Sequence, residues 1–316
     1  MHPPTPQRIR LQPQTGGASM VVAPAGGGRV CELILPLNGI SHAIIDGFGE
    51  DEAIDGDRRY KSAPLIPFPN RVNRGQYTFG GTTHQLPINE PRQGHAIHGL
   101  LYDCLMTVEN AQITDHLAQI QLAYSYVGQA EGYPFPFDLE LNYGISGQDG
   151  FSCSTTVRNT GSTDLPLGVG WHPYLNLPGG ISKWTLQLPH CQIYTLDDLS
   201  IPTGSKRDYP DFSAPTQLAD VYLNGCFALT WAALQTEIVF GSPDNDRQVV
   251  FWMESGPDQY RYFQLFTPPD RMSIAVEPMS CCVDAFTNQN GLIRLEPGDT
   301  FEAMYGLQLR PFTQLT

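Results

Sequence analysis

The fold is decided by three successive segments: LAQIQLAYSY (residues 117–126), FDLELNYGI (137–145) and FSCSTTVR (151–158). Apolar and polar side chains alternate along each segment, which is typical of a β-strand with one face in the core and one in water. Similar segments recur along the chain, at residues 30–36, 76–79, 84–88, 104–109, 184–188, 226–231, 236–241, 248–253, 261–266, 273–276 and 301–309. This repetition predicts a protein built almost entirely of strands.

Turn-forming sequences separate these segments, among them Gly80-Gly81, Asn159-Thr160-Gly161 and Pro297-Gly298-Asp299. Long stretches with the 3.6-residue apolar period of a helix are almost absent. The chain of 316 residues is also rich in glycine (31) and proline (27), as proteins with many short strands and turns are. We therefore predict an all-β fold, a large antiparallel β-sandwich.

No linker divides the chain, so residues 21–316 are expected to form a single domain. Residues 1–20 are polar and rich in proline and glycine, and we expect them to be a disordered N-terminal segment. Residues 197–217 are predicted to form a long polar loop. Loops of this length in compact folds tend to be functional rather than to join domains.

The charge of the chain restricts its partners. The formal net charge of −14 repels phosphate backbones and anionic lipid head groups. Nucleic acids and membranes are therefore not expected as partners, and a neutral small molecule is favoured. The sequence has no apolar run of the length that a signal peptide or a membrane span needs, which predicts a soluble, cytoplasmic protein.

The cysteines are expected to be reduced thiols. There are seven of them, an odd number, and no two are spaced as CxxC. This usage fits a reducing compartment. A disulfide between the neighbours Cys281 and Cys282 would be strained, so we expect two small buried side chains there, and the sequence assigns that pair no further role.

Two segments in the first third of the chain combine ionisable side chains with a stiff backbone. In PFPNRV (67–72), two prolines lead up to Arg71, whose guanidinium suits fixed hydrogen bonds to hydroxyl oxygens. In HAIHG (95–99), the glycine after His98 allows the backbone to approach a ligand closely. An exposed loop arginine and a hydrogen-bonded structural histidine would explain the same residues, and two histidines could also bind a metal.

Two later segments have the same character. The segment GVGWHPY (168–174) gathers a tryptophan, a histidine and a tyrosine, and aromatic rings beside polar groups suit stacking on a sugar. The segment VEPM (276–279) places Glu277 at the end of an apolar strand, where a carboxylate is costly unless it is paired or functional. Core aromatics and a salt-bridged glutamate remain the alternatives, and histidine and glutamate are competent metal ligands. These residues indicate a ligand site without specifying a reaction.

Taken in order along the chain, these segments resemble the motifs of the galactose mutarotase (aldose 1-epimerase) family. The matching stretches are Pro69-Asn70-Arg71, Gly75 to Phe79, Gln85-Leu86, His98-Gly99, Gly132-Tyr133-Pro134, Asn159-Thr160-Gly161, Leu165-Pro166, Gly170 to Tyr174, Pro202-Thr203-Gly204, Asp220-Val221-Tyr222, Glu277-Pro278-Met279 and Asp284-Ala285-Phe286. The ordered set covers roughly residues 30–310 and is specific, although no single motif is. The family fold is a large antiparallel β-sandwich, in agreement with the strand pattern.

The resemblance implies roles for individual residues. His172 matches the family's catalytic acid, and Glu277 matches its catalytic base. Four residues match positions that bind the sugar: Asn70, Arg71, His98 and Asp220. His95 has no counterpart with a role, and Leu105-Met106 stand where the family commonly has a tryptophan, which bears on the preferred sugar more than on the chemistry.

The activity that the resemblance implies is interconversion of the α and β anomers of a free aldohexose such as glucose or galactose. Opening the ring requires a base that removes the C1 hydroxyl proton and an acid that protonates the ring oxygen. We expect ionised Glu277 to be the base and protonated His172 the acid, with the carboxylate raising the imidazole pKa above its usual value of about 6.5. The reaction requires no metal or cofactor. Monomer and homodimer are both compatible with the sequence.

Three alternatives stay open. A hexose-6-phosphate 1-epimerase of the same fold would need a basic cluster, for which Arg71, Arg74 and Arg92 are candidates, although the acidic net charge disfavours it. A non-catalytic carbohydrate-binding or sugar-sensing protein on the same scaffold would not need both an acid and a base. A cupin-like metalloenzyme would usually carry an HxH pair, whereas His95 and His98 are three positions apart.

Overall fold

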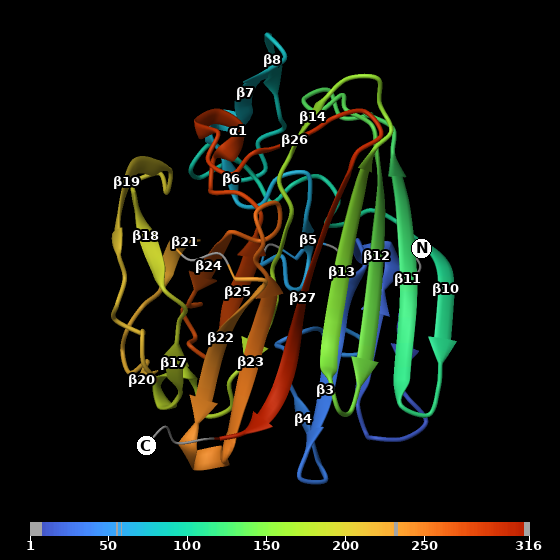
Figure 1. Cartoon of the computed structure of the whole chain (residues 1–316), viewed down its shortest axis with the longest axis vertical. Helices are drawn as coiled ribbons and strands as arrows, with labels where there is room; N and C mark the ends of the chain where they lie inside the picture. Colours follow the sequence, from blue (N-terminus) through green and yellow to red (C-terminus); the bar gives the residue numbers. More distant parts are fainter. Residues whose placement is uncertain (1–7, 55, 58, 231–232, 313–316) are drawn as a thin grey trace.

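The computed structural model describes residues 8–54, 56–57, 59–230 and 233–312. Its strands form a nine-stranded sheet, an eight-stranded sheet, a four-stranded sheet and three two-stranded pairs (Figure 1). All pairings in the two large sheets are antiparallel. Within the described ranges the single α-helix is α1 (Ala285–Asn288). The predicted all-β antiparallel fold is therefore confirmed.

The nine-stranded sheet contains the segments whose alternation is strongest. Its strands lie in the order β10 (Thr107–Ile113), β11 (Leu117–Tyr126), β12 (Phe137–Ser146), β13 (Gly150–Asn159), β27 (Thr300–Pro311), β23 (Arg247–Glu254), β22 (Gln235–Ser242), β17 (Thr185–Gln187) and β20 (Thr216–Gln217). Figure 1 shows β27, in red, between β13 and β23 in the middle of this sheet. The predicted strands 117–126, 137–145 and 151–158 are each found within one residue of the expected bounds.

The eight-stranded sheet carries the later motifs. Its strands are β19 (Pro202–Asp208), β18 (Cys191–Leu196), β21 (Asn224–Leu229), β24 (Tyr262–Phe266), β25 (Ser273–Met279), β15 (Gly170–Trp171) and β5 (Pro64–Leu65), with β16 (Tyr174–Asn176) also paired to β25. Every residue of β25 is buried, because neighbours cover both its edges and both its faces. This explains why its residues 274–276 are apolar without alternation, and why Glu277 directly after them is conspicuous.

The smaller sheets occupy the beginning of the described chain and the loops. The four-stranded sheet has the order β1 (Ile9–Leu11), β2 (Ser19–Ala23), β3 (Arg29–Leu37) and β4 (Ile40–Ala43). The pairs are β14 (Leu165–Leu167) with β26 (Ile293–Leu295), β6 (Arg71–Val72) with β9 (Ala96–Ile97), and β7 (Gln76–Phe79) with β8 (Thr82–Gln85). The described residues also form four 3₁₀ turns: η1 (Pro24–Gly26), η2 (Asn73–Gly75), η3 (Ile181–Lys183) and η4 (Pro243–Asn245).

Two predictions about irregular segments differ from the structure. Residues 1–20 were expected to be disordered, but β1 pairs with the buried strand β2, and Leu11 is 1% exposed in the core. Residues 1–7 lie outside the described residues. The polar loop expected at 197–217 contains strand β19, whose mostly exposed side chains lack apolar alternation because it forms an edge of its sheet.

One hydrophobic cluster joins the inner faces of the sheets. It includes Leu11 from β1, Phe251 from β23, Phe263 from β24 and Leu307 from β27. Residues from both large sheets thus share one core, as in a sandwich. A single domain over residues 21–316 stays a prediction. Among the described residues, no helix has both the length and the apolar character to cross a membrane.

Candidate active site

A cavity of about 940 Å³ opens beside the eight-stranded sheet and collects most of the predicted site residues. Asn70, Arg71, His98, His172 and Glu277 all line it. They come from separate parts of the chain, and their side chains were singled out by four different motifs. The volume lies within the usual range for sites that enclose small molecules, roughly 300–1,000 Å³.

The two proposed catalytic side chains are held by adjacent strands. Glu277 lies within β25, and His172 lies in the turn between β15 and β16, which both pair with β25. The backbone of His172 is fixed on the other side, where its N–H donates to the carbonyl of Ala63 at 3.1 Å. As a result, Nε2 of His172 lies 3.4 Å from Oε1 of Glu277. Both side chains are at least nine-tenths buried, with 6% and 3% exposed.

Asn70 and His98 are placed by unusual backbone conformations. Both have a positive φ, 56° for Asn70 and 63° for His98. Asparagine tolerates this region, whereas a histidine there is uncommon and needs support from its surroundings. The support is a hydrogen bond of 2.9 Å from the N–H of His98 to the carbonyl of Asn70, at the end of the β6–β9 pair. Gly99 follows with a φ of 73°, and a Cβ there would lie 2.2 Å from the carbonyl oxygen of Ile66.

The Arg71 side chain is oriented by a carboxylate that the sequence did not reveal. Its Nε and Nη2 donate to the two carboxylate oxygens of Glu90 at 2.8 and 2.7 Å, and Nη1 donates to Oδ1 of Asn70 at 3.2 Å. A two-point arginine–carboxylate contact fixes the plane of the guanidinium. Arg71 therefore enters the cavity in one orientation and with its charge largely balanced by Glu90.

Burial controls the protonation of the central pair. It raises the pKa of Glu277 from 4.5 to about 8, although nearby Arg71 opposes the change. Burial also lowers the pKa of His172 from 6.5 to about 4. The expectation that Glu277 raises the pKa of His172 is therefore wrong, because the loss of hydration disfavours both charges. At neutral pH the pair holds one proton, and that proton resides on the carboxyl group.

Several polar atoms at the cavity have no partner among the described residues. They are Nδ1 of His98, Nδ1 of His172, Oε2 of Glu277 and Oε1 of Gln264. Buried polar atoms are rarely left without hydrogen bonds, so this cluster is suited to hold a polar ligand. Burial also lowers the pKa of His98 well below its usual value, which keeps its imidazole neutral.

Among the described residues, His98, His172 and Glu277 could together hold a metal ion at this site. The ligand atoms of His98, His172 and Glu277 lie within 4.8 Å of one another. Two imidazoles and a carboxylate are ligands that zinc accepts. The reaction expected from the sequence does not require an ion, and the absence of a resident metal stays a prediction.

Asp220 is the predicted site residue that the structure does not bring to the cavity. It is exposed in a turn, whereas Asn224, four residues later at the start of β21, lines the cavity. Asn224 accepts a hydrogen bond of 3.0 Å from Nε2 of Gln264, which lies directly opposite Glu277 in the β24–β25 register. Gln264 is 3% exposed within the apolar segment YFQLF, and that buried polar position is the signal that could have identified it.

The two features without a predicted role have structural explanations. His95 is fully buried: Nδ1 accepts from the backbone N–H of Arg74, and Nε2 contacts the carbonyl of Leu199, both at 3.1 Å. It thus joins the loop before β19 to the 3₁₀ turn η2. All seven cysteines are free, and Cys281 and Cys282 are buried, as expected.

Comparison with known proteins agrees with this geometry. Residues 9–308 match the model of the family described as aldose 1-epimerase. An uncharacterised Escherichia coli protein, YihR, is 30% identical over 254 residues, which cover 77% of each chain. Mouse galactose mutarotase is 26% identical over 165 residues, covering 51% of this chain and 46% of the mouse protein.

The fold also matches solved structures. A galactose mutarotase-like protein from Clostridium acetobutylicum superposes with a TM-score of 0.82 at 21% identity, over 94% of each chain. A likeness at this level of identity shows that the two proteins share a fold. The family match extends across both large sheets and every strand that contributes to the cavity.

Proposed function

The chain belongs to the aldose 1-epimerase family, and we propose that it is a mutarotase that interconverts the α and β anomers of a free aldohexose such as glucose or galactose. The observation that carries the proposal is the contact of 3.4 Å between His172 and Glu277 in a cavity large enough for a sugar. A base and an acid placed together in this way can move both protons that ring opening requires.

The proton shared by the pair sets the order of events. Before a sugar binds, it is expected on Glu277, because burial raises the pKa of that carboxyl to about 8. When a sugar fills the cavity, its hydroxyl groups hydrogen-bond to the carboxylate and favour its charged form, as Arg71 already does. Transfer of the proton to His172 then leaves Glu277 as the base for the C1 hydroxyl and His172 as the acid for the ring oxygen. The roles reverse when the ring closes.

The remaining polar groups are proposed to hold the sugar while C1 turns. Arg71, Asn70 and His98 approach the cavity from the β6–β9 side, and Asn224 and Gln264 approach from the sheet. Asp220, which the resemblance suggested, is replaced in this role by Asn224. Fixing the sugar hydroxyls on both sides keeps the reacting atoms aligned, which can account for a large part of a rate enhancement. The free thiols fit action in a reducing compartment such as the cytoplasm.

Replacement of the carboxyl group tests the proposal. Glu277→Gln keeps the size of the side chain but cannot accept the proton, so the catalysed rate of mutarotation should fall by about 10²–10⁴-fold. The rate is followed by polarimetry on freshly dissolved α-glucose and α-galactose, and sugar binding by calorimetry. Glu302→Gln, on an exposed position of β27, is the matched control and should keep the wild-type rate. A Glu277→Gln variant with the wild-type rate would remove Glu277 from the mechanism, and sugar binding without any rate in the wild type would indicate a sugar-binding protein.

A hexose-6-phosphate is the second candidate substrate, because Arg59 and Arg92 lie at the cavity in addition to Arg71, which is already paired with Glu90. Arg59 and Arg92 are exposed and line it, whereas Arg74, also considered from the sequence, does not. Arg59 is paired with Asp46 at 2.7 Å, which leaves Arg92 as the better phosphate ligand. Rates on glucose and glucose 6-phosphate distinguish the candidates. Arg92→Ala should slow the phosphorylated sugar alone if that is the substrate.

A further inference from the structure

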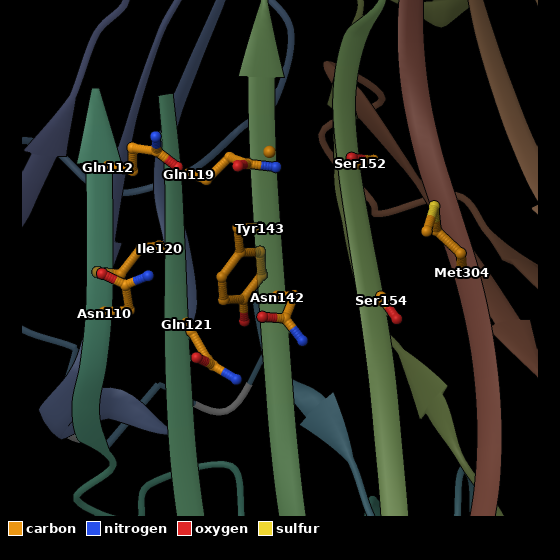
Figure 2. A pocket seen from close by; sticks show the side chains of 11 residues that line it. Asn110, Gln112, Gln119, Ile120, Gln121, Asn142, Tyr143, Ser152, Ser154 and Met304 are labelled. Atoms are coloured by element: carbon orange, nitrogen blue, oxygen red, sulfur yellow. The ribbon is translucent and has the colours of Figure 1, made fainter. Parts of the chain in front are cut away.

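A second hollow, of about 190 Å³, lies on the nine-stranded sheet and shares no residue with the candidate active site. It crosses β10, β11, β12, β13 and β27, as Figure 2 shows. Ile120 and Tyr143 also border it, but both are buried in the core. The other side chains form what is here called the amide groove: Asn110, Gln112, Gln119, Gln121, Asn142, Ser152, Ser154 and Met304.

The amide groove carries no charge on a strongly charged chain. The sequence has 32 acidic and 18 basic residues, yet none of them lines the hollow. Most of its polar side chains also make no hydrogen bond to the described protein residues. Among the described residues, one side chain of the groove has a hydrogen-bond partner, Asn142, which donates to Glu140 at 2.7 Å. The other amides and hydroxyls are therefore available to a ligand, and each amide can donate and accept at once.

The strand register arranges these groups in two rows across the sheet. One row runs from Gln112 through Gln119, Gly144 and Ser152, and the next runs from Asn110 through Gln121, Asn142, Ser154 and Met304. Because neighbouring strands lie about 4.8 Å apart, polar groups recur along each row at that interval. Successive hexose units in an extended glycan recur at a similar interval. Gly144 leaves out a side chain in the middle of the first row, which deepens the floor of the groove.

An aromatic ring continues the first row beyond the hollow. Ser152 pairs with Gly306, and Gly306 pairs with Trp252 on β23. The indole lies over Gly306, because a Cβ at that glycine would be 2.5 Å from the ring. Among the described residues, no group accepts a hydrogen bond from the buried Nε1 of Trp252. An aromatic ring in line with polar side chains is a suitable surface for the apolar face of a pyranose.

We propose that the amide groove binds a neutral, extended oligosaccharide of hexose units, at a site separate from the catalytic cavity. The chemistry favours this occupant over others. Anionic polymers are repelled by the net charge of −14 and find no basic group in the groove. A protein partner would require an apolar centre, whereas Met304 is the only apolar side chain among the eight that form the groove. Neutral hydroxyl groups match amides that both donate and accept.

The test is calorimetric titration of the whole protein with maltohexaose and cellohexaose whose reducing ends have been converted to alditols, so that no ring is presented to the cavity. The wild type should bind at least one of the two. The double variant Gln121→Ala/Asn142→Ala should weaken that binding by at least tenfold. Gln235→Ala, which truncates an exposed amide on β22 outside the groove, is the matched control and should bind as the wild type does.

The proposal is independent of the catalytic assignment, and Glu277→Gln separates the two. This variant should bind the hexasaccharide as tightly as the wild type even if mutarotation is lost. Failure of both oligosaccharides to bind the wild type would overturn the proposal. Unchanged binding by the double variant, or loss of binding in Glu277→Gln, would also overturn it, since the oligosaccharide would then occupy another site.

Discussion

Raising the pH from about 6.5 to about 8.5 should weaken the folded state through one buried group, Glu277. Burial raises its pKa from 4.5 to about 8, and unfolding restores the ordinary value. The folded state therefore binds this proton more tightly. The stabilising contribution of Glu277 is complete below about pH 4.5 and is lost as the pH rises through about 8. A difference of one bound proton changes the free energy of unfolding by about 1.4 kcal/mol per pH unit, which gives a loss of about 2 kcal/mol over this interval.

His172 has the opposite dependence on pH. Burial lowers its pKa from 6.5 to about 4, so its contribution is present above about pH 6.5 and is lost as the pH falls through about 4. Between about pH 4.5 and 6.5 the unfolded chain carries one proton on the imidazole, while the folded chain carries one on the carboxyl. The two states then bind equal numbers of protons, so this pair should leave stability unchanged with pH until the pH exceeds about 6.5.

Urea denaturation of the wild type and of Glu277→Gln at the two pH values measures this effect. The variant cannot ionise at position 277, and its other titrating groups are shared with the wild type and cancel in the comparison. The wild type should lose about 2 kcal/mol more than the variant between about pH 6.5 and 8.5. Equal losses would refute the reasoning, because they would mean that Glu277 keeps an ordinary pKa in the folded protein.

Two further predictions concern the loops that hold the sugar-binding side. Gly99→Ala should lower the free energy of unfolding by several kcal/mol in urea titrations, because its Cβ would lie 2.2 Å from the carbonyl oxygen of Ile66. The control is Gly204→Ala, which has a φ of 89° and no atom within 4 Å of the added Cβ, and which should lose only about 1 kcal/mol. Equal losses of stability in the two variants would contradict the steric explanation. Glu90→Gln should raise the KM for the sugar by about tenfold with a smaller change in kcat, because Arg71 loses the carboxylate that accepts two of its hydrogen bonds. Steady-state kinetics measures both constants. A fall in kcat with an unchanged KM would contradict this role.

The sequence predicted the strands with a clear apolar alternation and missed the shortest strands and the neighbouring strands β18 and β19. The segments that became β11, β12 and β13 alternate over ten residues each, so the period itself specifies which face is buried. By contrast, β5 and β15 are two residues long, and a pattern cannot be read from two residues. They form strands because β25 and its neighbours offer them hydrogen-bonding edges, which is information carried by the tertiary structure.

The residues of the candidate site also divide into those that the sequence predicted and those that it missed. Residues in motifs with proline or glycine, such as Arg71, His98 and His172, were found and converge on the cavity. Glu90 was missed because its importance comes from a partner 19 positions earlier in the chain, which no local pattern reveals. The position of the proton shared by His172 and Glu277 was also mispredicted. A histidine beside a glutamate suggests an ion pair, but the extent of burial decides whether the two side chains are charged or neutral.

The position of β27 has a consequence for the synthesis of the chain. This strand closes the larger sheet by pairing with both β13 and β23. A ribosome finishes β13 at Asn159 but begins β27 only at Thr300, and at roughly 5–20 residues per second this leaves an interval of about 7–30 s. Throughout that time the newly made β13 has a free edge, which is a template for pairing with another nascent chain. Correct production in a cell should therefore depend on chaperones that shield this edge until residues 300–311 have emerged.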